Sequence, residues 1–171
     1  MVGIAPPYKE SVQEQLPEKS APNDPNDNLR KFIADALELE WSELLDRGLA
    51  FIHAVKCAIV PEKAGFENPP IEVIDLCAPY HFGRELQLIE PGRVIAFGKA
   101  PVRSILRTPG CSVPSKIKLS SKLKDIRGEH KGVIREKAFP LHLTYFPRAG
   151  NKKKAGEDLV RAAKMSGIIR H

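Results

Sequence analysis

The fold is decided by FIHAVKC at residues 51–57 and DLCAPYHFGRELQLIEPGRVIAFGKAPVRSIL at residues 75–106. The first piece alternates apolar and polar residues, which predicts a strand. A long helix over residues 71–89 and an apolar strand at 93–97, closed by Gly98, complete a βαβ unit. Because ligands bind at the carboxyl ends of strands in open α/β sheets, the end of FIHAVKC and the turn at Gly98 are predicted to lie beside any site.

The rest of the chain continues the alternation of strands and helices. Asn28 caps an amphipathic helix, and residues 116–137 are ambiguous, with a hairpin as one interpretation. The expected strands are at 2–4, 49–56, 93–97 and 139–146, and the expected helices are at 71–89, at 101–107 and at 152–165. A further helix starts at Asn28 and ends at Gly48, and Trp41, Leu44 and Leu45 either continue it or start a second turn. This order predicts an α/β fold with a single three-layer α/β/α domain over residues 1–171, around a central, mainly parallel four-stranded sheet.

Charge is distributed unevenly along the chain. The net charge is +6, yet residues 116–171 carry 15 Lys and Arg against 5 Asp and Glu. A basic segment of this kind is typical of a protein that binds the phosphate backbone of DNA, although a merely solvated surface would look the same. The sequence has no apolar run of about 18 residues and no secretory signal, and its three cysteines do not form a disulfide framework. We therefore expect a monomeric cytoplasmic protein without a membrane partner.

Five segments, in order, resemble motifs of the uracil-DNA glycosylase superfamily, most closely its bacterial and archaeal iron–sulfur branch. FIHAVKC is similar to the family's Ile-Thr-Asn-x-Val-Lys-Cys strand, and residues 75–98 resemble its Cys-x-Pro-Tyr helix and following strand. The other three are VGIAPPYKE (2–10), similar to a Gly-Glu-Ala-Pro-Gly loop followed by an acid, LTYFPRAG (143–150), similar to Thr-Tyr-His-Pro, and GEDLVRAAKM (156–165), similar to the closing helix. The resemblance implies a DNA repair enzyme that hydrolyses the N-glycosidic bond of a flipped deaminated base such as uracil.

The resemblance also implies site residues, and the sequence departs from the family at several of them. Ile4 stands where the family has its first acid, so Glu10 is the remaining candidate acid, and His53 replaces the asparagine that reads the base. Phe146 replaces the histidine that stabilises the leaving base, although it could stack on a base instead. The implied catalytic residues are Glu10 and His53, and the implied base pocket comprises Gly3, Ala5, Pro6, Tyr8 and Phe146. From the residues alone, a solvated Glu10, a core His53, a core Phe146 and plain loop packing of Tyr8 are the alternatives.

The resemblance further implies contacts with DNA and an iron–sulfur cluster. The candidate phosphate-binding residues follow the last strand and lead into a helix: Arg148, Asn151, Lys152, Lys153 and Lys154. Cys57 and Cys77 match two ligands of a [4Fe–4S] cluster, which usually needs four thiolates, and Cys111 is a weak third candidate. Because the chain starts within a strand, we expect either an upstream segment that supplies the other ligands or loss of the cluster.

Two other functions remain open from the sequence. The first is a catalytically degenerate member of the superfamily that binds nucleic acid without releasing a base. The second is a different α/β enzyme built on a similar sheet, because a fold does not determine a function.

Overall fold

The computed structural model describes residues 2–3, 28–54 and 70–169, and within these ranges the chain forms one mixed sheet flanked by helices. The strands are β1 (Val2–Gly3), β2 (Ile52–His53), β3 (Val94–Phe97), β4 (Cys111–Ser112), β5 (Gly128–Ile134) and β6 (Lys137–Thr144). Their order across the sheet is β2-β1-β3-β6-β5-β4. The first four of these are mutually parallel, whereas β5 and β4 run antiparallel to their neighbours. The α/β class is confirmed, but the prediction of a mainly parallel four-stranded sheet is wrong.

The antiparallel part of the sheet comes from the segment that the sequence left ambiguous. Strands β5 and β6 form a hairpin joined by Arg135 and Glu136, whose φ angles are 46° and 68°. Two-residue hairpin turns need positive φ at one or both central residues and are usually built from Asn-Gly or Asp-Gly. The pair Arg135–Glu136 is not one of these favoured turn sequences, so the position of the turn could not be predicted from the sequence.

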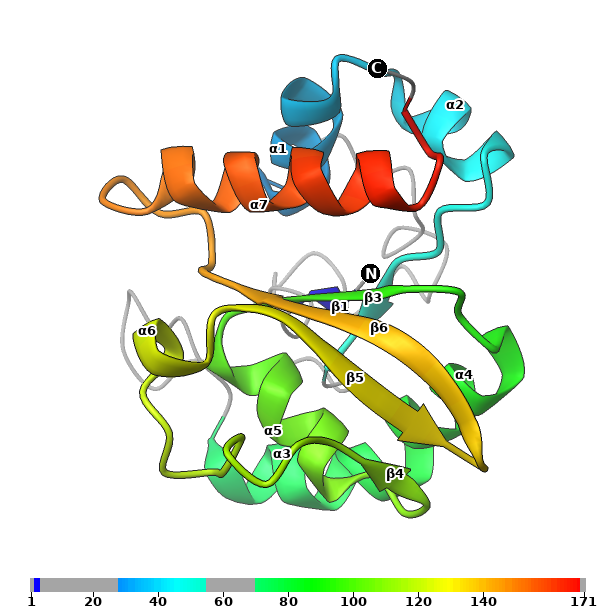
Figure 1. Ribbon diagram of the computed structural model, residues 1–171, viewed down its shortest axis with the longest axis vertical. Helices are drawn as coiled ribbons and strands as arrows, with labels where there is room; N and C mark the ends of the chain where they lie inside the picture. Colours follow the sequence, from blue (N-terminus) through cyan, green and yellow to red (C-terminus); the bar gives the residue numbers. More distant parts are fainter. Residues whose placement is uncertain (1, 4–27, 55–69, 170–171) are drawn as a thin grey trace, which may run out of the picture.

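The helices cover both faces of the sheet (Figure 1). On one face lie α1 (Asn28–Leu37), α2 (Trp41–Asp46) and α7 (Lys152–Met165); on the other lie α3 (Ile71–Cys77), η3 (Ala78–Phe82), α4 (Gly83–Ile89) and α5 (Lys99–Arg107). A short helix, α6 (Leu123–Ile126), precedes β5. The predicted helix over 71–89 is present as the continuous run α3–η3–α4, whose central turn is a π-helix. Within the described ranges, none of the helices has the length and apolar character needed to cross a bilayer.

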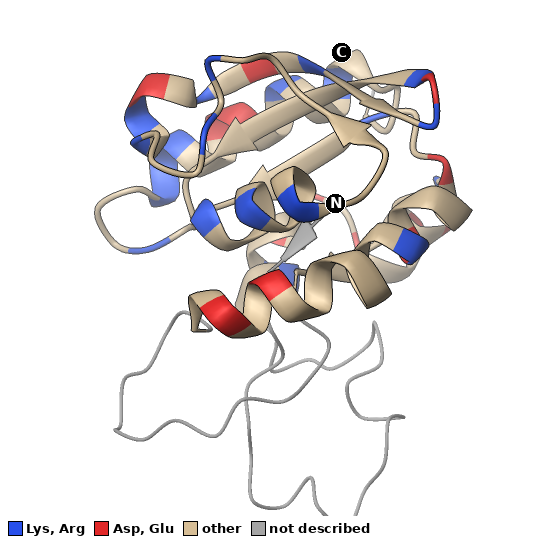
Figure 2. Cartoon of the chain, turned by 90° about the horizontal axis from the view of Figure 1, so that it is seen from below, with Lys and Arg blue, Asp and Glu red and all other residues tan. Residues whose placement is uncertain are grey.

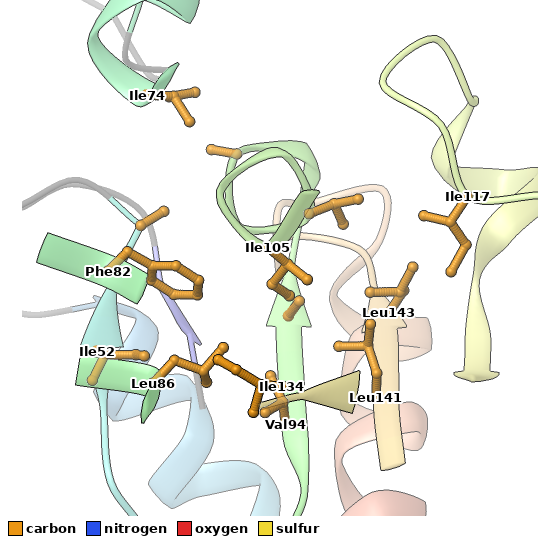
Figure 3. Close-up of a cluster of buried hydrophobic side chains, with 14 of the residues drawn as sticks. Ile52, Ile74, Phe82, Leu86, Val94, Ile105, Ile117, Ile134, Leu141 and Leu143 are labelled. Atoms are coloured by element: carbon orange, nitrogen blue, oxygen red, sulfur yellow. The ribbon is translucent and has the colours of Figure 1, made fainter. Parts of the chain in front are cut away.

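Each face of the sheet carries its own hydrophobic core. The strand β3 shows the alternation most clearly: Val94 and Ala96 join the cluster under α3, α4 and α5, while Ile95 and Phe97 join the cluster under α1, α2 and α7. We call these the α5-side core and the α7-side core. All four β3 residues are buried, as expected for a central strand covered on both faces. Figure 3 shows Ile105 of α5 and Leu143 of β6 among the side chains of the α5-side core.

A glycine in β5 gives the hairpin a point of close packing. A Cβ atom added at Gly132 would lie 2.6 Å from Cε2 of Phe139, a buried residue directly opposite on β6. We expect Gly132→Ala to lower the free energy of unfolding by about 1–3 kcal/mol, because the aromatic ring must leave its packed position. Urea denaturation measures this, and Gly92→Ala is the control, since a Cβ there would meet no atom within 4 Å. Equal destabilisation of both variants would contradict the packing argument.

Candidate functional site at the carboxyl edge of the sheet

The parallel strands end together at one edge of the sheet, which we call the carboxyl edge. The register pairs Gly3 with His53, Val2 with Ala96, and Phe97 with Thr144, so the last residues of β2, β1, β3 and β6 lie in one row. Three strand spacings of about 4.8 Å separate β2 from β6, which puts the ends of the row about 14 Å apart. The row brings together the strand ends that carry Gly3, His53 and, two residues after Thr144, Phe146.

His53 is half-buried and lies on the α7 side of the sheet. Its ring meets that of Phe51 edge to face at a centroid distance of 5.1 Å, and Phe51 packs in the same way against Trp41 at 6.0 Å. The guanidinium carbon of the buried Arg30 lies 4.9 Å from the centre of the Phe51 ring. The aromatic neighbours orient the imidazole at the strand end, where one ring nitrogen can donate and the other accept a hydrogen bond.

Phe146 is also half-buried and packs closely against the turn after β3. Gly98 has a φ of 87°, and a Cβ added to it would lie 3.4 Å from Cβ of Phe146. The Gly98 amide donates to the carbonyl of Thr144 at 2.9 Å, which fixes the two strand ends together. Phe146 contacts the α7-side core, and the guanidinium carbon of Arg148 lies 5.8 Å from the ring centre. The residue thus combines core packing with a position at the carboxyl edge.

A cavity of about 440 Å³ opens where β3 and β6 end. Tyr145 and Phe146 line one side, and apolar side chains of α3 and α5 line the others. Lys99 and Lys118 also belong to the lining, and the described lining residues include no Asp or Glu. Tyr145, Lys99 and Lys118 were not predicted from the sequence. The position of Lys99 directly after the Gly98 turn was a usable signal, because that turn was expected beside the site.

The predicted phosphate-binding residues lie together at the same edge. Arg148, Lys152, Lys153 and Lys154 are exposed, and Asn151 is half-exposed at the residue before α7. The Asn151 side chain makes no capping hydrogen bond to the helix. The amino end of a helix carries a partial positive charge, so α7 adds to the field of the lysines. Figure 2 shows that Lys and Arg gather at the end of the molecule where Figure 1 places α6 and the start of α7.

A buried carboxylate of α7 joins the end of β6 to Arg127, the residue between α6 and β5. The Asp158 side chain accepts hydrogen bonds from Arg127, from Nε at 2.7 Å and from Nη2 at 2.9 Å, and one from the Thr144 hydroxyl at 2.6 Å. Burial by itself would raise the pKa of Asp158, but these hydrogen bonds outweigh it and hold that pKa below its usual range. Arg127 also lies 5.6 Å from the centre of the Tyr145 ring. The network therefore holds a residue of the cavity wall in place.

His142 lies on the same side of β6 but away from the edge. The residue is 1% exposed, and its Nε2 atom is 3.8 Å from Oδ1 of Asp158. Burial lowers the pKa of His142, although the Asp158 charge opposes the shift. The neutral, buried imidazole cannot take the place of an electrophilic histidine at the edge.

The described residues do not form an iron–sulfur ligand set. Cys77 is buried within the α5-side core, and Cys111 lies on β4, where burial raises the pKa of its thiol to about 11. Such a thiol stays protonated at neutral pH and is a poor metal ligand. Within the described ranges no group of three or more His, Cys, Asp or Glu could hold a metal ion. Cys57, like the predicted site residues Ala5, Pro6, Tyr8 and Glu10, lies outside the described residues, so the cluster stays a prediction and no chemical step is derived through it.

In comparisons with known proteins, neither a protein-family model nor a curated protein matches this chain. What the chain does is therefore inferred from its residues and their geometry.

Proposed function

We propose that the protein is a DNA base-excision glycosylase with a uracil-DNA glycosylase-like three-layer fold, acting on a flipped deaminated base such as uracil. The observation that supports this most is the row formed by Gly3, His53, Phe97 and Thr144, since it aligns the strand ends that carry three of the implied pocket residues. The exposed lysines that follow at the start of α7 suit the phosphates of a DNA strand.

Each residue of the proposed site has a distinct role in base release. An enzyme cannot reach a glycosidic bond within a stacked duplex, so the nucleotide must turn out into the site. His53 can donate to one atom of the base edge and accept from another, while Phe146 offers an aromatic surface on which the base can stack. The bond from the sugar C1′ to the base nitrogen then breaks, and the base leaves with its electron pair. Water forms the new bond to C1′, and its proton neutralises the departing base.

Base release from oligonucleotides tests this proposal. The purified protein should release uracil or hypoxanthine from a labelled strand, leaving an abasic site that alkali cleaves, and its binding to DNA should weaken with salt. Absence of release from single- and double-stranded substrates, while a uracil-DNA glycosylase cuts them, would end the enzymatic proposal.

The lysines at the start of α7 provide the binding arm of the same test. Replacing Lys152, Lys153 and Lys154 together with Gln should reduce the slope of log affinity against log salt by about 2 on a single strand and by about 3 on a duplex, because each lysine neutralises about one phosphate. A triple variant with Lys131→Gln, Arg135→Gln and Lys164→Gln removes the same charge from exposed positions elsewhere and should keep the slope. Equal slopes for both triple variants would show that net charge, not this edge, drives binding.

A catalytically degenerate nucleic-acid-binding protein is the second candidate. Phe146 packs against the α7-side core and has no hydrogen-bond donor that could stabilise a departing base. Both observations favour this candidate. This candidate predicts salt-sensitive DNA binding without base release.

A further inference from the structure

The cavity at the carboxyl edge is adjacent to the proposed base site but lies on the opposite face of the sheet. Its walls include Ile74, Val102 and Ile126, which belong to the α5-side core. His53, by contrast, shares the α7 side of β2 with Phe51, because side chains two residues apart on a strand point to the same face. Phe146 belongs to both regions, as it packs on the α7-side core and lines the cavity. The cavity is therefore separate from the proposed base site, and Phe146 lies between the two.

The charges at the cavity favour an anionic ligand. Lys99 and Lys118 are exposed lining residues, and Arg148, which also lines the cavity, lies against the Phe146 ring. The remaining cation of the lining, Arg103, forms a two-bond ion pair with Asp75 at 2.5 Å for each bond, so its charge is already matched. The described lining contains no carboxylate, so the exposed Lys99 and Lys118 give this apolar slot a positively charged edge.

The walls of the cavity are held by side-chain hydrogen bonds. The Ser121 hydroxyl donates to the carbonyl of Lys116 at 3.1 Å and accepts from the amide of Lys118 at 2.9 Å, which braces the loop that carries Lys118 and Leu119. On the other side, Arg127 is anchored on Asp158 and lies against the Tyr145 ring. A preformed site of this kind loses little entropy when a ligand binds.

We propose that this cavity takes the base of a nucleotide next to the extruded one, in the same DNA strand, and this proposal rests on the proposed function. Aromatic side chains such as Tyr145 and Phe146 stack on any base, and Lys99, Lys118 and Arg148 can hold the adjoining phosphates. The volume of about 440 Å³ lies within the range of small-molecule sites. A flat apolar ring joined to phosphates matches both the lining and the charge.

The proposal has a consequence for the preferred substrate. In a duplex the neighbouring base is paired and stacked, so it cannot enter a cavity on the other face of the sheet without further unpairing. In single-stranded DNA the same base is free to enter. The protein should therefore bind a single strand more tightly than the matching duplex, and a base next to the target should contribute to that preference.

Oligonucleotide binding tests the cavity without requiring catalysis. Fluorescence anisotropy with a strand of about 11 nucleotides, which carries one C-linked uracil that cannot be hydrolysed and that sets the register, should give about tenfold tighter binding than the matching duplex. A single abasic residue is then placed at each position of the strand in turn. At one position, loss of the base should remove most of the preference for the single strand over the duplex. Leu106→Trp, which fills the cavity from α5, and Leu119→Ser, which removes its apolar lip, should each lose the preference. Leu119 is 43% exposed, so its replacement spares the core, and the exposed Leu88→Ser is the matched control.

The outcomes separate the cavity from the proposed function. If folded Leu106→Trp and Leu119→Ser keep the full single-strand preference and the same sensitivity to the abasic residue, the cavity assignment is overturned. Base release by the wild type would stand in that case. If the wild type binds the strand through the cavity but never releases a base, the enzymatic proposal fails and the cavity assignment holds.

Discussion

Replacing Asp158 with Asn is expected to lower the free energy of unfolding at pH 7 by about 2–4 kcal/mol, because it breaks a buried ion pair. The side chain of Asp158 is 2% exposed, whereas that of Arg127 is 29% exposed. The arginine can therefore turn partly toward water when its partner is lost, which keeps the expected cost below the upper end for fully buried pairs. The amide introduced by the substitution would also leave one donor facing Arg127. Urea denaturation measures the difference.

The pH dependence identifies the carboxylate as the cause. The pKa of Asp158 is held below its usual value of 3.8, so folding favours the ionised form. Its contribution to stability is complete above about pH 4 and disappears as the pH falls through the folded-state pKa. The gap between the wild type and Asp158→Asn should therefore shrink at low pH. Asp125→Asn, at an exposed acid of α6, should have little effect at any pH. A constant gap across the whole pH range would assign the loss to packing rather than to charge.

The titration of His142 should also affect how the free energy of unfolding depends on pH. Burial lowers the pKa of this residue below 6.5, so the unfolded chain binds a proton that the folded chain resists. Stability is then expected to fall as the pH drops below about 6.5, and to fall more steeply in Asp158→Asn, because that variant lacks the carboxylate charge that opposes the lowering of the His142 pKa. The two titrations occupy different pH windows, which allows the carboxylate to be read separately.

The elements with regular periodicity were predicted well from the sequence. The helix at 152–165 and the helical run over 71–89 have the predicted bounds, because their apolar positions recur at helical spacing and Pro70 marks a start. Strand β3 was also predicted, apart from its first residue. The antiparallel half of the sheet was left ambiguous, with a hairpin within residues 116–137 as one interpretation, because the Arg135–Glu136 turn achieves positive φ without glycine or asparagine.

The sequence predicted only those parts of the candidate site whose residues are close together in the chain. Phe146 and the lysines at the start of α7 come directly after a recognisable strand, so their place at the edge could be inferred. The cavity is built from α3, α5, the loop around Ser121 and the end of β6, segments that are far apart in sequence. The buried position of Asp158 could have been predicted, because this residue interrupts the buried stripe of Ala155, Leu159 and Ala162 on α7. A charged residue on such a stripe indicates a buried partner.

Replacing Phe146 with His is expected to raise the rate of base release by about a hundredfold, if the edge binds a flipped base as proposed. A single donor aimed at a developing negative charge is worth about 10²–10³ in rate, and Phe146 lies at the carboxyl edge of the sheet, beside the proposed base site. The nearby guanidinium of Arg148 favours a neutral imidazole, which still has one N–H to donate. Single-turnover measurements with saturating protein separate this chemical step from binding.

Two further substitutions make the Phe146→His result decisive. Phe146→Leu keeps apolar packing against the α7-side core without a donor, and Phe146→Gln adds a polar group of similar length with different geometry. Both lose the aromatic stacking surface and should bind the uracil-containing strand more weakly than the wild type, but at saturating protein they should release base no faster. If Phe146→His is folded, binds DNA and is no faster than Phe146→Leu, then Phe146 does not face the leaving base. If the wild type is inactive and Phe146→His alone gains activity, the protein binds nucleic acid through a base site that lacks only one hydrogen-bond donor for catalysis.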